Sequence, residues 1–181
     1  MEIVKTTIHH IEELNKNSCV TVGMFDALHK YHKLIIAKTA ELAKQFDLSS
    51  IVITFNHKPT KSAETLIQEE KKIAYIKENF NIDKLIILYV DEQLINTSKE
   101  AFVQILKDKL KVIKMVEGSD FRFGYQKAGD INYLIESFGI DNIFIFERDL
   151  SVSTSKIKKL IEKYKIDEVE KELEVDINLL K

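Results

Sequence analysis

The chain has 181 residues, which is long enough for one domain that buries a continuous core without disulfides or a structural metal. Its hydrophobic fraction of 45% and charged fraction of 31% are typical of soluble globular proteins and exclude the disordered and membrane classes. Because 27 basic residues accompany 29 acidic ones, the chain has no overall positive field, and we expect no nucleic-acid partner.

The N-terminal segment has the features of an intracellular protein. It lacks the uninterrupted apolar stretch of a signal peptide or a membrane span. Cys19 is the single cysteine, so no intramolecular disulfide can form, and its apolar neighbours predict that it is buried. We therefore expect a cytoplasmic protein with no membrane partner.

Short apolar runs rich in β-branched residues predict buried strands along the chain. These runs cover residues 19–22, 50–55, 84–89, 112–116 and 142–146. The segments between them carry one apolar stripe at helical spacing, which predicts amphipathic helices, and a further helix is expected beyond Ser153. Strands buried on both faces and separated by helices indicate parallel crossovers. We predict a single α/β domain over residues 1–181, with a Rossmann-like, mostly parallel sheet of about five strands and helices on both faces.

The loops that follow the strands are the expected binding segments, because ligands of such sheets bind beyond the carboxyl ends of the strands. The first loop runs over residues 23–32 and leads into a helix expected to open at Lys33. His29 and His32 are three residues apart and share one side of this helix start. Together with the helix N-terminus they suit a polyphosphate. Metal ligation and ordinary structural histidines remain alternatives.

The second loop follows the second predicted strand and reads Thr-Phe-Asn-His-Lys-Pro over residues 54–59. Asn56 and His57 are candidates for nucleotide contact, and a polar loop without a ligand is the alternative. Lys58 can contact a phosphate as a point charge.

The third loop, residues 117–130, is the longest segment without a helical or strand period, and it holds Gly118, Gly124 and Gly129. Such a loop is more typical of a binding segment than of a connector. Its central run is Asp120, Phe121, Arg122, Phe123 and Gly124, with Asp130 closing the loop. A guanidinium between two aromatic rings can combine phosphate contact with stacking on a flavin or a purine. A buried ion pair between the acid and the arginine is the alternative.

The last candidate segment is a helix start rich in hydroxyl groups and cations. Its hydroxyls belong to Ser153, Thr154 and Ser155, and its cations to Lys156 and Lys158. These groups can hold the β- and γ-phosphates of a nucleotide and neutralise the charge that develops during transfer. An ordinary capped helix with a basic face is the alternative.

In this order the four segments resemble the sequence pattern of the FMN adenylyltransferase domain of bacterial FAD synthetases, within the His-x-Gly-His nucleotidyltransferases. The first loop is similar to Gly-x-Phe-Asp-Gly-x-His-x-Gly-His, and the second to Thr-Phe-x-Pro-His-Pro. The third is similar to Gly-x-Asp-Phe-Arg-Phe-Gly followed by Gly-Asp, and the last to Ile-Ser-Ser-Thr-Arg-Ile-Arg. The matches run from about residue 20 to residue 160.

The resemblance implies that the phosphate of FMN attacks the α-phosphorus of ATP to give FAD and pyrophosphate, with Mg²⁺ helping to neutralise the triphosphate. The catalytic residues it implies are His29, His32, Lys156 and Lys158. The ATP-binding residues it implies are Gly23, Phe25, Asp26, His29, His32, Ser153, Thr154 and Ser155. The flavin- or nucleotide-binding residues it implies are Asn56, His57, Asp120, Phe121, Arg122, Phe123, Gly124 and Asp130.

Some positions depart from the family pattern, and they keep other interpretations open. Ala27 and Tyr31 stand where the family has glycine, so a flavin- or nucleotide-binding homologue without transferase activity is the main alternative. A related transferase with another acceptor, such as nicotinamide mononucleotide or phosphopantetheine, is a further one. Bifunctional family members carry a riboflavin kinase domain after this region, and no part of it is visible here. We therefore expect a separate riboflavin kinase to supply FMN.

Overall fold

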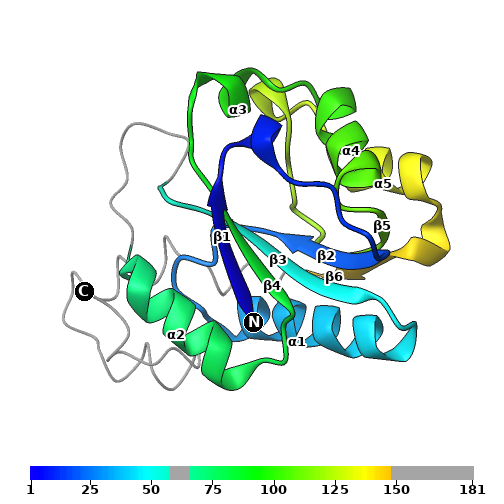
Figure 1. Cartoon of the computed structure of the whole chain (residues 1–181). Helices are drawn as coiled ribbons and strands as arrows, with labels where there is room; N and C mark the ends of the chain where they lie inside the picture. Colours follow the sequence, from blue (N-terminus) through cyan, green and yellow to red (C-terminus); the bar gives the residue numbers. More distant parts are fainter. Residues whose placement is uncertain (58–65, 148–181) are drawn as a thin grey trace.

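The computed structural model describes residues 1–57 and 66–147, which form an α/β fold (Figure 1). Six strands make one sheet in the order β1-β4-β3-β2-β5-β6, and each neighbouring pair runs parallel. The strands are β1 (Glu2–Thr6), β2 (Ser18–Val22), β3 (Ser49–Phe55), β4 (Lys84–Leu88), β5 (Val112–Gly118) and β6 (Ile143–Phe146). The predicted Rossmann-like parallel sheet is confirmed, with six strands in place of about five.

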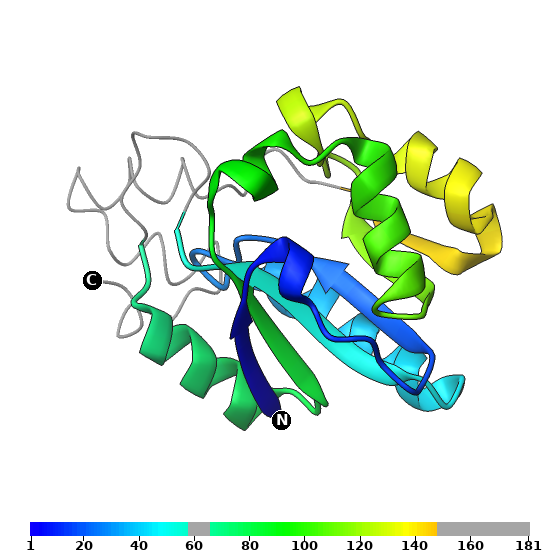
Figure 2. The same cartoon turned by 45° about the horizontal axis from the view of Figure 1, so that its top comes forward.

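Helices cover both faces of the sheet (Figures 1 and 2). One face carries α1 (Lys30–Gln45) and α2 (Glu69–Asn79). The other face carries α3 (Glu92–Asn96), α4 (Lys99–Asp108) and α5 (Ile131–Phe138). No helix within residues 1–57 and 66–147 is long and apolar enough to cross a membrane.

Alternating side chains of the central strands build a core on each face, because successive residues of a strand point to opposite sides. Val20 and Ile51 pack with residues of α4 and α5, whereas Cys19 and Val52 pack with residues of α1 and α2. Cys19 is fully buried, as its apolar neighbours predict, and burial raises the pKa of its thiol to about 12. The double burial explains why these strands read as continuous apolar runs.

The strand β1 was missing from the sequence prediction. Among the described strands it lies at the edge of the sheet and pairs with β4, from Glu2 opposite Lys84 to Thr6 opposite Leu88. An edge strand needs no continuous apolar run, and none of the β1 residues is fully buried. Its charged and partly exposed residues therefore gave no strand signal.

Candidate functional site

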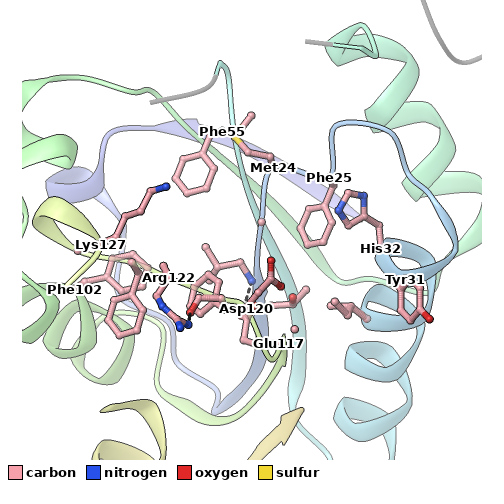
Figure 3. A pocket seen from close by; sticks show the side chains of 18 of the residues that line it. Met24, Phe25, Tyr31, His32, Phe55, Phe102, Glu117, Asp120, Arg122 and Lys127 are labelled. Carbon is pink, nitrogen blue, oxygen red and sulfur yellow. Dashed lines mark hydrogen bonds between the residues drawn. The ribbon is translucent and has the colours of Figure 1, made fainter. Parts of the chain in front are cut away.

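A cavity of about 640 Å³ opens at the carboxyl ends of the strands. The strand order changes direction at β2, with β3 on one side and β5 on the other. Such a switch point is where parallel α/β sheets bind their ligands. The lining residues lie at the ends of β2, β3, β5 and β6, in the loops after β2 and β5, or in α1, α3 and α4. Figure 3 labels ten of them: Met24, Phe25, Tyr31, His32, Phe55, Phe102, Glu117, Asp120, Arg122 and Lys127.

The first loop brings its two histidines together on the cavity wall. The helix α1 begins at Lys30, three residues before the predicted start, so His29 takes the N-cap position. The imidazole rings of His29 and His32 stack with their centroids 3.6 Å apart, and the ring of Phe25 meets His32 edge-on. Both imidazoles therefore line the cavity beside the start of a long helix. Their contact with phosphate stays a prediction.

The backbone of this loop adopts a shape that non-glycine residues rarely take. Phe25 and Leu28 have φ angles of 47° and 44°, in the left-handed region. A side chain at Gly23 would put its Cβ 2.9 Å from the ring of Phe25, so glycine allows the ring to fold back over the loop. Because left-handed backbone costs roughly 1–2 kcal/mol per non-glycine residue, the surrounding structure must hold the loop in place.

The residues that replace family glycines lie in different places. Ala27 is fully buried in the structure, away from the cavity lining. Tyr31 lies at the cavity rim beside the start of α1, with its hydroxyl directed away from Asp120 (Figure 3). The ring centroid of Tyr31 is 6.4 Å from that of His29, whereas the two histidine rings contact each other. The tyrosine ring therefore does not separate the two imidazoles.

Asp26 does not reach the cavity, although the sequence predicts that it contacts ATP. It is 2% exposed, and its Oδ1 accepts a hydrogen bond from the backbone N–H of Leu66 at 2.6 Å. The carboxylate thus anchors the segment that enters α2, behind the loop that carries His29.

Three further predicted contacts also lie outside the cavity lining. The side-chain oxygen of Asn56 accepts from the backbone N–H groups of His57 and Val90, which joins the ends of β3 and β4. His57 is exposed just beyond β3. Asp130 caps α5 by accepting from the N–H of Tyr133 at 3.0 Å, a local role that stabilises the helix start.

The central run of the third loop lines the cavity opposite the histidines. The rings of Phe121 and Phe123 stack at 5.5 Å, and Phe123 also meets Phe102 of α4 at 5.3 Å. Asp120 and Arg122 are both exposed, so the alternative of a buried ion pair between them is wrong. The Nη1 of Arg122 instead donates to the carbonyl oxygen of Phe121. The loop therefore offers an aromatic wall and an accessible guanidinium.

Gly124 lets this loop approach α4 closely. Its φ is 74°, and a Cβ there would lie 2.7 Å from the backbone N of Lys99. We expect Gly124→Ala to lower the free energy of unfolding by more than the roughly 1–2 kcal/mol that left-handed backbone costs. Urea unfolding would measure the loss.

Gly139→Ala is the matched control for Gly124→Ala. Gly139 also has a positive φ, of 88°, but the nearest atom to its added Cβ is a side-chain nitrogen of Asn142 at 3.8 Å. The difference between the two variants therefore isolates the contact with the α4 backbone. Equal losses would show that this contact contributes nothing.

Glu117 lies at the floor of the cavity, although it is not among the residues predicted from the motifs. Its side chain is 2% exposed, and its Oε1 accepts from the backbone N–H of Val22 at 2.8 Å. The pairing of β2 with β5 runs from Ser18 only to Val20, so the carboxyl bridges the two strands where the ladder ends. Burial raises the pKa of Glu117 well above its usual value. A lone acid at the end of an apolar strand was its only sequence signal.

The remaining wall consists of residues that were not predicted as site residues. Lys127 lines the cavity from the end remote from His32 (Figure 3), on a turn where Gln126 and Lys127 both have left-handed backbone. Leu94 and Ile95 of α3 line the cavity as well. Leu94 and Ile95 are distant in sequence from the motifs, and only the chain fold brings them to the site, whereas Lys127 lies within the third loop.

Some predictions concern residues that the structure does not describe. Lys58, Ser153, Thr154, Ser155, Lys156 and Lys158 lie outside the described ranges. Within the described part, no group of three or more His, Cys, Asp or Glu side chains could hold a metal ion. The metal alternative for His29 and His32 therefore lacks a third protein ligand there.

Comparison with known proteins decides the family. Residues 11–159 match the family described as FAD synthetase. The chain belongs to the FAD synthetase family. The bifunctional riboflavin kinase/FMN adenylyltransferase of Buchnera aphidicola subsp. Acyrthosiphon pisum is 29% identical over 175 residues, covering 89% of this chain and 55% of its own length. The protein of the same name from Pseudomonas fluorescens is 26% identical over 166 residues, covering 87% and 52%.

This FAD synthetase family chain spans about half the length of these curated relatives. A solved structure with a similar fold is the crystal structure of a macrolide-efflux protein from Streptococcus pneumoniae, with a TM-score of 0.74. It is 20% identical and covers 89% of this chain and 56% of its own. At this identity the likeness shows the fold alone.

Proposed function

We propose that this chain is an FMN adenylyltransferase, which transfers AMP from ATP to FMN and releases pyrophosphate. One observation carries the proposal: a single cavity is lined by the stacked His29 and His32 at the start of α1 and by the Asp120–Gly124 loop. A phosphate-binding helix start and an aromatic wall in one cavity suit a reaction between two nucleotides. Family membership supports the same reaction.

In the proposed reaction a phosphate oxygen of FMN forms a bond to the α-phosphorus of ATP. The bond from that phosphorus to the bridging oxygen breaks, and pyrophosphate leaves with its electrons. Such chemistry depends on in-line positioning and on neutralising the charge of the phosphates. His29, His32 and the free N–H groups of α1 bind the phosphates, and the first turn of α1 contains no acidic residue that would oppose them. Ser153–Ser155, Lys156 and Lys158 are proposed to steady the leaving pyrophosphate.

The other end of the cavity is proposed to hold a flat ring system. Phe55, Phe102 and Phe121 provide apolar and aromatic surface there. Arg122 and Lys127 add positive charge beside these rings. Stacking and cation contact together suit the isoalloxazine of FMN or the adenine of ATP.

Mg²⁺ belongs to the same proposal. This ion typically keeps several waters and binds through one or two carboxylates together with substrate phosphates. Asp120, an exposed carboxylate on the cavity wall, fits such a shared site. The described residues contain no group of three or more His, Cys, Asp or Glu side chains that could hold the ion without the substrate. Bound there, the ion would neutralise charge on the triphosphate. We also propose that the reaction takes place in the cytoplasm.

The test is chromatographic detection of FAD after the purified protein is incubated with FMN, ATP and Mg²⁺. FAD that requires both nucleotides would support the proposal. FMN binding by fluorescence without any FAD would contradict it and would favour a nucleotide-binding homologue that lacks transferase activity.

A further inference from the structure

Lys72 on α2 is an unusual residue for the interior of this fold. Its side chain is only 4% exposed, although lysine is almost never fully buried unless it is paired. It does not line the cavity, and no sequence motif includes it. A buried ammonium needs hydrogen-bond partners, and its partners indicate what it does.

The ammonium of Lys72 joins the end of β3 to the loop that follows β2. Its Nζ donates to the hydroxyl of Thr54 at 3.0 Å, to the carbonyl of Met24 at 3.3 Å and to the carbonyl of Phe55 at 3.5 Å. The hydroxyl of Thr54 in turn donates to the same Met24 carbonyl at 3.2 Å. An ammonium has three donors, and here each of them has an acceptor.

Asp26 supplies the opposite charge. Burial lowers the pKa of Lys72, and the negative charges of Asp26 and Glu69 act against that lowering. Asp26 is itself buried and accepts from the backbone of Leu66. The lysine and the aspartate therefore place a pair of opposite charges directly behind the loop that leads to His29.

The hydrogen bonds of Lys72 and Asp26 stabilise the left-handed backbone of the loop after β2. Phe25 lies between Met24 and Asp26, and it has left-handed backbone, as does Leu28 just before His29. Strained backbone of this kind persists only where neighbouring structure fixes it. Lys72 fixes the residue before Phe25, and Asp26 is fixed through Leu66.

We propose that Lys72 is a positioning residue, which holds the loop of residues 23–29 in the shape that sets His29 and His32 against each other. The expected consequence is that Lys72 controls the affinity for ATP without contacting ATP, and this consequence rests on the proposed function. At the ring-binding end of the cavity, Phe102, Phe121 and Arg122 belong to α4 and the third loop, whereas Lys72 contacts the backbone carbonyl of Phe55 at the end of β3.

Lys72→Met tests the proposal, because methionine keeps an unbranched apolar side chain and removes the charge. Lys77→Met is the matched control, since Lys77 is an exposed lysine of the same helix. We expect Lys72→Met to raise KM for ATP about tenfold to a hundredfold, as small displacements of binding groups do. KM for FMN should change little. Lys72→Gln, which keeps a donor without the charge, serves if the methionine variant does not fold.

The imidazole NMR signals give a readout that needs no substrate. In Lys72→Met the signals of His29 and His32 should shift, while those of the exposed His9 and His10 stay in place. Unchanged His29 and His32 signals would overturn the proposal. If the wild-type protein forms no FAD, the proposed function fails, and the same signals still decide the role of Lys72.

A double variant separates positioning from stability. Adding Asp26→Asn to Lys72→Met should restore part of the lost thermal stability, because it removes the buried negative charge that the Lys72 ammonium had offset. It should not restore the affinity for ATP. Recovery of both together would mean that Lys72 acts only through overall stability, which would overturn the proposal.

Discussion

Replacing His29 by alanine is expected to lower kcat/KM for FAD formation by about a hundredfold to a thousandfold, as removal of a single group that stabilises transition-state charge does. The imidazole lies on the cavity wall, stacked on His32 at the start of α1. Alanine removes both the ring and its N–H donors at the point where the phosphates are proposed to bind. Steady-state kinetics with FMN, ATP and Mg²⁺ would measure the loss.

His29→Asn separates loss of the imidazole from loss of fold. Asparagine is among the best N-cap residues, and the side chain of His29 makes no capping hydrogen bond. We therefore expect His29→Asn to retain or raise the melting temperature and still lose activity. His9→Ala, at an exposed site away from the cavity, is the control and should keep wild-type rates. Full activity in both His29 variants would remove this histidine from the mechanism.

Replacing Glu117 by glutamine is expected to make the protein more stable than the wild type as the pH rises. Burial raises the pKa of this carboxyl well above 4.5 in the folded state. Between the unfolded and the folded pKa, the native protein keeps a proton that the unfolded chain has lost, so wild-type stability falls with rising pH over that window. Glutamine stays neutral and can still accept from the N–H of Val22. The gap between the two proteins should close as the pH approaches 4.5.

Denaturant unfolding at a series of pH values would measure the effect of Glu117→Gln. Glu78→Gln is the control, because Glu78 is an exposed acid on α2. The control should follow the wild-type curve across the whole range. Parallel curves for wild type and Glu117→Gln would show that the folded protein carries this carboxylate in its charged form without cost.

The central part of the fold could be predicted from the sequence because burial on both faces leaves an unambiguous pattern. β2, β3 and β4 appear in the sequence as continuous apolar runs because helices cover the side chains on both faces of these strands. The edge strand β1 is covered much less and carries charges, so its pattern resembles that of a loop. The start of α5 has a local signal, because Asp130 directly before it is a typical N-cap residue.

Residues of the candidate site could be predicted only where the functional side chains lie close together in the sequence. His29 and His32 share a side because they are three residues apart at a helix start, and Asp120 and Arg122 share one loop. Asp26 and Asp130 belong to the same motifs but hold backbone N–H groups instead of lining the cavity. Sequence cannot distinguish an acid that contacts a ligand from one that shapes a loop.

Residues outside the motifs reach the site through the chain fold. Lys72 is one of several charged residues on an amphipathic helix, and Glu117 lies in an apolar strand that also contains Lys114. Their burial and their partners, Met24 and Val22, are set by contacts between segments far apart in the chain. These long-range contacts leave no local sequence signal.

The strand order also has a consequence for how the chain folds. β1 precedes the other described strands in the sequence, but its neighbour among the described strands is β4, so Glu2 can pair only after Lys84 is in place. β2 and β3 are separated by a single helix and can pair much earlier. Closing a long loop costs conformational entropy, and this cost comes before the contacts that stabilise the closed loop can form. Strand β1 therefore docks onto a sheet that has already begun to form, although it precedes the central strands of that sheet in the sequence.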